Sequence, residues 1–159
     1  EWKNPKFGKT KLSHLKAEDI QTLSKLIHSA GSHEERLKIL LYDNNKKREG
    51  IKLATATAIL TILYPDNFTV YDIRVRSQWK VICPSDEYDL YPNITESKEV
   101  TKLYFTDYFP KIRTFADNNK MSLRDCDRAL WAKSWRDDLS KFLKRYDIES
   151  NPHWEEVYF

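Results

Sequence analysis

One glycine turn and one carboxylate are the features of this chain whose residue types and spacing could do chemistry. Gly50 lies in a basic turn, an apolar helix rich in small residues follows it, and Pro65 ends that helix. A short extended run then leads to Asp72. A glycine turn ahead of a helix leaves the first N–H groups of that helix unpaired, and such donors bind phosphate oxygens well. A phosphate-binding turn followed at fixed distance by one carboxylate is a layout for chemistry on nucleic acid.

The carboxylate of Asp72 suits the cleavage of a bond between a sugar and a base. A carboxylate can stabilise the positive charge that develops on the sugar, and it can orient a water for attack on the anomeric carbon. An enzyme acting on a base must also hold that base in an aromatic or apolar pocket. Tyr71 and Trp79 are our candidates for such a pocket. The alternative role for Asp72 is that of a helix N-cap, which is common for Asp before an amphipathic run.

Positive charge gathers on both sides of these features, within a net charge of +3. Basic side chains near Gly50 predict contacts to a nucleic-acid backbone, which fix position without reading sequence. The candidate DNA-binding residues are Lys47, Arg48, Gly50, Lys52, Thr55, Arg74 and Arg76. A solvated loop is the alternative for the basic run around Gly50, because charge runs usually face solvent. Surface salt bridges are an equally good interpretation of the two arginines that follow Asp72.

The bulk composition excludes several classes of protein. The chain has 159 residues, of which 40% are hydrophobic and 32% charged, and this suits a globular fold rather than disorder. No apolar run is long enough to span a bilayer and no signal peptide is visible, although the chain begins at Glu1 rather than Met, so an N-terminal piece can be missing. Cys83 and Cys126 are too few for a disulfide scaffold, and the histidines lack metal-ligand spacing. We expect a cytoplasmic monomer with reduced thiols, without membrane, metal or small-molecule cofactor.

The elements that must position these residues are helices. Apolar residues recur at helical spacing along the chain, and useful strand alternation is absent. Ser32 with Glu35, Asp72, and Ser122 with Asp125 are the predicted N-terminal caps. Pro110 is expected to kink or split a long helix. The predicted helices cover about 20–30, 33 to the polar run 43–48, 53–64, 73–83, 96–118 and 123–138, with 139–146 as a separate short helix.

These elements predict an all-α architecture of six to eight helices with a helical hairpin at about 33–64. The chain is expected to form one helical domain over 1–159. A two-lobe division of that domain would join a central lobe at about 32–83 to a second lobe made from the terminal segments. Trp79, Trp131 and Trp135 are expected in the core, because large aromatic side chains on inner helix faces mostly pack there. Cys126 is expected to be a small core residue.

The segment from about Ile39 to Arg76 resembles the helix-hairpin-helix DNA glycosylase superfamily. In that family a pattern of the form Leu-Pro-Gly-Val-Gly-x-x-Thr-Ala leads through an apolar helix to Val-Asp-x-x-Val. Here the chain reads Arg48-Glu-Gly-Ile-Lys-Leu-Ala-Thr-Ala56 and then Tyr71-Asp-Ile-Arg-Val75. The residues that match at the family's spacing are Gly50, Ile51, Thr55, Ala56 and Asp72. The wider chain is similar to small bacterial relatives of the endonuclease III and 8-oxoguanine glycosylase fold.

The resemblance implies that Asp72 is the catalytic aspartate and that the Gly50 turn binds DNA phosphate. Lys52 stands where the family has its second hairpin glycine, so the turn is less able to press against a phosphate backbone unless the lysine side chain compensates. Ala54 occupies the position at which bifunctional members carry a Schiff-base lysine. The resemblance therefore implies a monofunctional enzyme that uses water.

The expected function is DNA N-glycosylase activity on a damaged or modified base, as in base-excision DNA repair. A role against modified foreign DNA is left open. The alternative is a non-catalytic helix-hairpin-helix module that binds DNA, and a third reading is a helical domain without a nucleic-acid partner.

Overall fold

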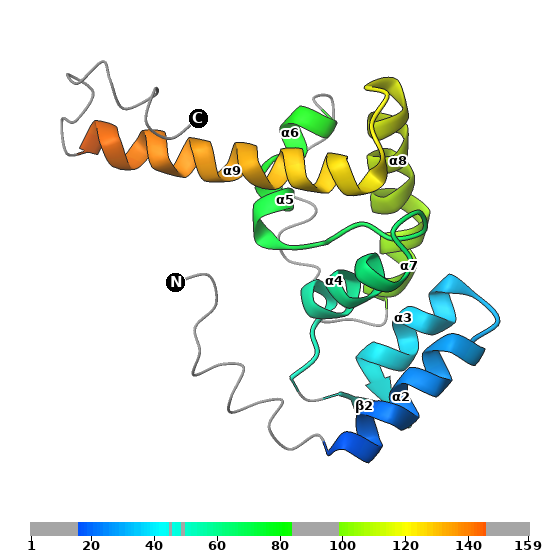
Figure 1. Cartoon of the computed structure of the whole chain (residues 1–159). Helices are drawn as coiled ribbons and strands as arrows, with labels where there is room; N and C mark the ends of the chain where they lie inside the picture. Colours follow the sequence, from blue (N-terminus) through cyan, green and yellow to red (C-terminus); the bar gives the residue numbers. More distant parts are fainter. Residues whose placement is uncertain (1–15, 45, 49, 84–98, 146–159) are drawn as a thin grey trace.

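The computed structural model describes residues 16–44, 46–48, 50–83 and 99–145 (Figure 1). These residues are mostly helical, which confirms the all-α class predicted from the sequence. None of the helices in the described ranges is long and apolar enough to cross a membrane.

Two helices form the N-terminal part of the described chain. Helix α2 spans Ala17–Ser29 and helix α3 spans His33–Leu41, and they pack against each other (Figure 1). The predicted cap of α3 is confirmed, because Ser32 Oγ accepts a hydrogen bond from the Glu35 amide at 3.1 Å. Glu35 Oε2 in turn accepts from the amide of Gly31 at 2.8 Å. The sequence therefore marks this helix start correctly, since the signal is a local hydrogen-bond pattern.

A small β-hairpin connects α3 to helix α4, which spans Leu53–Leu63. Strands β1 (Tyr42–Asp43) and β2 (Lys46–Lys47) pair antiparallel, with Tyr42 opposite Lys47 and Asp43 opposite Lys46. The backbone of Asn44 is left-handed, with φ of 47°, at the turn between the strands. The polar run 43–48, which was predicted to end the helix, thus lies in a two-stranded β-hairpin.

The helix predicted over 73–83 is interrupted, and the structure corrects this boundary. Helix α5 spans Ile73–Ser77 and helix α6 spans Trp79–Ile82. Gln78 lies between them, and its amide donates to the carbonyl of Val75 at 3.0 Å. The side chain of Gln78 donates to Asp137 Oδ2 at 3.1 Å. A tertiary contact therefore stabilises the break between α5 and α6, and no local sequence pattern predicts this break.

The helix predicted to bend at Pro110 contains a π-helical turn. Helix α7 (Glu99–Leu103) continues into the π-helix η2 (Tyr104–Tyr108) and then into α8 (Phe109–Asn118). Proline has no N–H and clashes with the carbonyl four residues earlier, so an ordinary α-helical turn cannot continue through it. The wider π turn directly precedes Pro110 and resolves this conflict.

The C-terminal helix α9 spans Leu123–Arg145 without a break, so the prediction of a separate short helix at 139–146 is wrong. Glycine and proline are both absent from this stretch, and nothing in it interrupts the ladder of backbone hydrogen bonds. The predicted cap is confirmed, since Ser122 Oγ accepts from the Asp125 amide at 3.0 Å. The buried face of α9 consists of Leu123, Cys126, Asp127, Leu130, Ser134 and Leu143.

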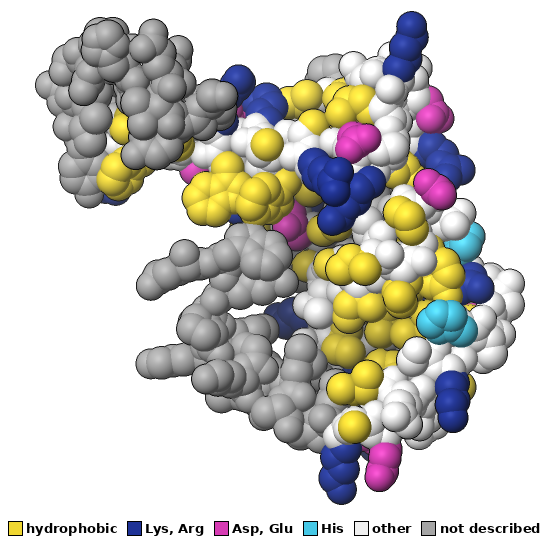
Figure 2. All heavy atoms as spheres, viewed as in Figure 1, with side chains coloured by type: hydrophobic (Ala, Val, Ile, Leu, Met, Phe, Trp, Pro, Cys, Tyr) yellow, Lys and Arg dark blue, Asp and Glu magenta, His cyan; other side chains and the backbone are white. Residues whose placement is uncertain are grey.

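The core prediction for Trp135 is wrong, because 42% of this residue is exposed. Trp131 is only partly buried. Hydrophobic side chains are exposed along α9 in the space-filling view of Figure 2. Trp131 and Trp135 lie one residue beyond the buried positions Leu130 and Ser134, on the flank of the stripe. The expectation for Cys126 is confirmed, since this residue is fully buried.

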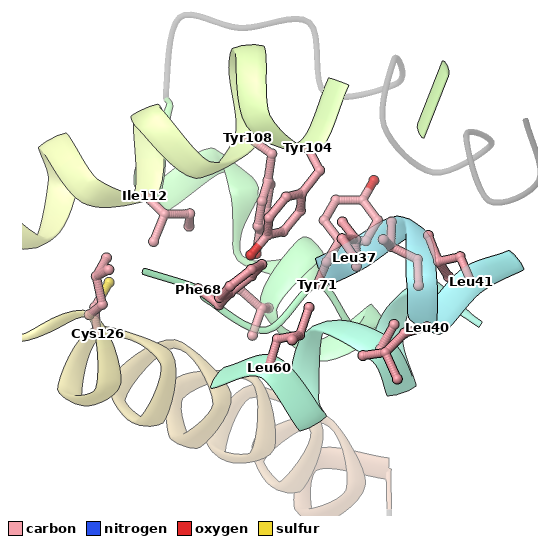
Figure 3. Close-up of a cluster of buried hydrophobic side chains, with 14 of the residues drawn as sticks. Leu37, Leu40, Leu41, Leu60, Phe68, Tyr71, Tyr104, Tyr108, Ile112 and Cys126 are labelled. Atoms are coloured by element: carbon pink, nitrogen blue, oxygen red, sulfur yellow. The ribbon is translucent and has the colours of Figure 1, made fainter. Parts of the chain in front are cut away.

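The buried side chains form one cluster that draws on α2, α3, α4, α5, η2, α8 and α9. Figure 3 shows its centre, where Tyr104 and Tyr108 lie beside Phe68 and Leu60. Helix α9 packs across α5 and α8 at one end of the molecule, and α2 with α3 lies at the other end (Figure 1). The central segment 64–72 runs between these parts, and it carries the candidate carboxylate. Residues 1–15, 84–98 and 146–159 of the predicted second lobe lie outside the described residues, and the two-lobe division stays a prediction.

Candidate functional site

Asp72 is the N-cap of helix α5. Its Oδ1 accepts hydrogen bonds from the amides of Arg74 and Val75, each at 2.9 Å. The backbone of Asp72 is extended, with φ of −113° and ψ of 174°, as an N-cap requires. The side chain is half-buried. Both capping bonds reach the same carboxylate oxygen, and Oδ2 accepts no hydrogen bond from the described part of the chain.

The segment 69–71 before Asp72 belongs to no helix or strand, and none of its backbone groups pairs with a described strand. Side chains take the place of a β-ladder. Tyr104 Oη accepts from the Thr69 amide at 3.0 Å and donates to the Thr69 carbonyl at 2.7 Å. Tyr108 Oη donates to the Val70 carbonyl at 2.8 Å. Buried backbone groups left unpaired are costly, so these hydroxyls fix the path of the chain into Asp72.

Helix α4 contributes to the same segment. Thr57 is fully buried, and its Oγ1 accepts from the Tyr71 amide at 3.0 Å while donating to the Leu53 carbonyl at 2.8 Å. A hydroxyl in a helix interior can serve the backbone of its own helix and a second chain segment at once. The helix that begins after the Gly50 turn is therefore bonded directly to the residue before Asp72.

Asp127 on α9 is a further side chain that forms hydrogen bonds with the segment 69–71. Its carboxylate accepts from the Thr69 hydroxyl through Oδ1 and from the Val70 amide through Oδ2 at 3.0 Å. Only 3% of this residue is exposed. Burial raises the pKa of the Asp127 carboxyl to about 6, the nearby negative charge of Asp72 adds to the rise, and the bonds from Thr69 and Val70 oppose it.

Tyr71, one of the two candidates for a base pocket, is a core residue in this structure. It is 5% exposed, and its ring meets the edge of Tyr108 with 4.6 Å between ring centroids. The guanidinium of Arg76 lies over the ring at 5.4 Å. Burial raises the pKa of the Tyr71 hydroxyl, against the opposing effect of its hydrogen bond with Arg76. The side chain of Trp79, the second candidate, lies outside the described side chains.

The turn ahead of α4 is the predicted phosphate-binding turn, and the structure describes Gly50 and Lys52 in it. Gly50 has φ of 79°, a left-handed conformation that glycine adopts without strain. Lys52 is the N-cap of α4, and its side chain makes no capping bond to the amides of the first turn. Thr55 lies in that turn and is partly exposed. Lys46 and Lys47 on β2 are exposed beside it.

The backbone of Lys52 does not need a glycine. Its φ of −97° and ψ of 170° are extended values that any residue adopts. The replacement of the family's second glycine by lysine is therefore compatible with the observed turn. Ala54 follows in the first turn of α4 and is partly exposed.

Two predicted DNA-binding arginines have partners within the chain. Arg48 donates to the carbonyls of Ile39 and Tyr42 at 3.4 and 3.3 Å, and so holds the β-hairpin against α3. Arg74 pairs with Asp138 on α9 at 2.9 Å and lies over Trp135. Both side chains join elements of the fold in this structure, and contact with DNA stays a prediction for each.

Sequence reasoning did not assign a role to Asp127, Tyr104, Tyr108 or Thr57. A signal was available for Asp127, because it lies four residues after Leu123 and three before Leu130, on the apolar stripe of its helix. A carboxylate at an inward position requires hydrogen-bond partners or a raised pKa. The partners themselves, 57 and 58 residues away, could not be read from that pattern.

No group of three or more His, Cys, Asp or Glu side chains is placed to hold a metal ion within the described ranges. No protein-family model, curated protein or solved structure matches the chain.

Proposed function

We propose that this protein is a monofunctional DNA N-glycosylase of the helix-hairpin-helix type, with Asp72 as its catalytic carboxylate. The observation that carries the proposal is the geometry of Asp72. One oxygen is fixed by two backbone amides at 2.9 Å, and the residue is half-buried at the end of a segment held by buried side chains. A carboxylate held rigidly in one place stabilises a developing positive charge better than one that must reorganise.

The chemistry follows from the two oxygens of Asp72. Oδ1 is committed to the Arg74 and Val75 amides. Oδ2 is the oxygen left to face the sugar, where it stabilises positive charge as the bond to the base breaks, or to orient the attacking water. The base leaves with the bonding electron pair, the water supplies the hydroxyl that replaces it on the anomeric carbon, and the remaining proton of that water passes to the departing base.

The turn before α4 supplies the proposed contact to the DNA backbone. The amides of the first turn of α4, which the Lys52 side chain does not cap, and the positive end of the helix dipole suit a phosphate oxygen. The exposed Lys46, Lys47 and Lys52 add positive charge at the same place. The Thr57–Tyr71 bond, at 3.0 Å, links this helix to the residue before Asp72, so a phosphate and the carboxylate would be held in one frame.

Ala54 supports hydrolysis rather than lyase chemistry. An alanine has no amine with which to form a Schiff base with the sugar. We expect no covalent protein–DNA adduct on treatment with borohydride during turnover. A trapped adduct would show that another amine is the nucleophile and would refute the monofunctional mechanism.

The decisive experiment is a base-release screen with oligonucleotides that carry many damaged and modified bases. Asp72→Asn keeps an oxygen to accept from the Arg74 and Val75 amides, because Asn is also a good N-cap, and removes only the charge. We expect its single-turnover rate constant on the best substrate to fall by about 10²–10⁴-fold. Asp117→Asn, the same change at an exposed position of α8, is the matched control and should keep full activity. Full activity of Asp72→Asn would refute the mechanism.

One observation favours a second candidate, a DNA-binding module without catalysis. Lys52 at the turn and the adjacent Lys46 and Lys47 are exposed, so this surface can attract DNA whatever the role of Asp72. This candidate predicts binding that weakens steeply with salt, no base release across the screen, and equal affinity for Asp72→Asn and the unmodified protein. Unchanged mobility of duplex DNA at low salt would refute both candidates.

A further inference from the structure

The backbone of residues 69–71 is held almost entirely by side chains from other elements. Three helical elements contribute: α4 through Thr57, η2 through Tyr104 and Tyr108, and α9 through Asp127. Figure 3 shows the two tyrosines reaching toward the segment between Phe68 and Tyr71. A segment held in this way has little conformational freedom, and Asp72 follows it directly. A shift of residues 69–71 should therefore also shift the Asp72 carboxylate.

Among these side chains Asp127 is the unusual one. Burying a carboxylate costs free energy unless hydrogen bonds compensate, and a neutral residue of the same size would avoid that cost. Asp127 uses both of its oxygens, one for the Thr69 hydroxyl and one for the Val70 amide. No other side chain of similar size accepts two such bonds with a full negative charge. It is also the partner that reaches the segment from α9.

We propose that Asp127 is a positioning residue for Asp72, which it holds in place through its two hydrogen bonds to residues 69 and 70. This inference rests on the proposed function for its effect on base release, but its effect on the position of Asp72 does not. Asp127 does not reach the substrate, because it is 3% exposed and both oxygens are occupied within the core.

The charged and titratable groups around Asp127 influence whether its carboxyl is protonated. Asp72 faces it from the segment, and Tyr104 and Tyr108 face it from η2. Arg124 and Cys126 belong to its own helix. The raised pKa of Asp127, about 6, follows chiefly from burial. A protonated Asp127 would still accept from the Val70 amide through one oxygen, while the other would donate to the Thr69 hydroxyl.

That difference suggests the variants to compare. Asp127→Ala removes both acceptors. Asp127→Asn keeps an oxygen for the Val70 amide and offers an N–H₂ to Thr69 Oγ1, so it should restore most of the positioning. Thr69→Val removes only one of the two bonds and nearly preserves side-chain shape, and it serves if Asp127→Ala does not fold.

The first readout is amide hydrogen exchange, which needs no substrate. The Arg74 and Val75 amides donate to Asp72 Oδ1, so their protection reports whether the carboxylate stays in place. We expect protection at the Val70, Arg74 and Val75 amides to fall by about tenfold or more in Asp127→Ala. Asp127→Asn should stay close to the unmodified protein, and Thr69→Val should lie between them. Core amides of α3, such as those of Leu40 and Leu41, should change little.

The second readout is base release under single-turnover conditions. In Asp127→Ala we expect the rate constant of base release at saturating protein concentration to fall by about tenfold or more. The protein concentration that gives half of this maximal rate should change little, because the phosphate contacts remain. Asp127→Asn should recover most of the rate. A fall in exchange protection that is equal at α3 and at residues 70–75, or no fall at residues 74 and 75, would overturn the inference. Absence of base release in the unmodified protein with the expected exchange pattern would instead refute the proposed function alone.

Discussion

The guanidinium of Arg74 lies 4.0 Å from the centroid of the Trp135 ring and at the same time pairs with Asp138 Oδ2 at 2.9 Å. Arg74 belongs to α5, the helix that Asp72 caps, whereas Trp135 and Asp138 belong to α9. The contact therefore fastens the start of α5 to the longest described helix. It also explains how a tryptophan can be 42% exposed and still contribute to the fold.

Arg74→Ala should lower the free energy of unfolding by about 1–2 kcal/mol, because it removes both the ring contact and the ion pair. Asp138→Asn removes only the ion pair, which is well exposed, and should cost less than about 1 kcal/mol. Urea unfolding of each variant measures the difference. An equal effect from Asp138→Asn and Arg74→Ala would mean that the ion pair, and not the ring contact, dominates.

Tyr104→Phe should destabilise the protein more than Tyr108→Phe. The Tyr104 hydroxyl serves two backbone groups of Thr69, and the Tyr108 hydroxyl serves the carbonyl of Val70. Each buried group left unpaired costs about 1–3 kcal/mol, so we expect Tyr104→Phe to cost roughly twice as much. Thermal or urea unfolding tests the order. Tyr64→Phe, at a partly exposed ring outside segment 69–71, is the control and should be nearly neutral.

The stability of the protein relative to Asp127→Asn should depend on pH. The pKa of Asp127 rises on folding from 3.8 to about 6, so the native state binds the proton more tightly than the unfolded state. The stabilisation of this group is therefore fully present below about pH 4 and is lost as the pH rises through 6. A pKa rise of that size corresponds to about 3 kcal/mol.

Urea unfolding of both proteins between pH 4 and 7.5 measures that relation. The free energy of unfolding of the unmodified protein, minus that of Asp127→Asn, should fall as the pH rises from 4 through 6 and then level off. Comparison with the variant removes the contribution of the other carboxylates. A constant difference would show that Asp127 is protonated, or ionised, equally in both states.

Gly50→Ala and Lys52→Gly should change the free energy of unfolding by different amounts, although both substitutions lie in the same turn. Gly50 has φ of 79°, where a Cβ costs about 1–2 kcal/mol, so Gly50→Ala should destabilise. Lys52 is extended and caps α4 without a side-chain bond, so Lys52→Gly should change stability by only a few tenths of a kcal/mol. If the turn binds DNA, Lys52→Gly should also make the salt dependence of binding shallower by about one counterion.

The parts of the fold that depend on local chemistry could be predicted from the sequence. Ser32, Asp72 and Ser122 cap helices as expected, because the capping bond joins residues two or three apart. The interruption at Gln78 could not be predicted, since a contact with Asp137 on a distant helix supports it. For the same reason the sequence did not reveal the side chains that hold residues 69–71, because these side chains lie 14 to 58 residues away from their partners.

The order in which helices dock has a consequence for when Asp72 reaches its place. Residues 69–71 cannot form their native hydrogen bonds until α4, η2 and α9 have come together, and their partners in η2 and α9 lie 35, 38 and 57 residues further along the chain. Closing such loops is entropically expensive and comes late in folding. A nascent chain would therefore form the turn before α4 early, whereas the carboxylate site would stay unassembled until α9 has left the ribosome and docked.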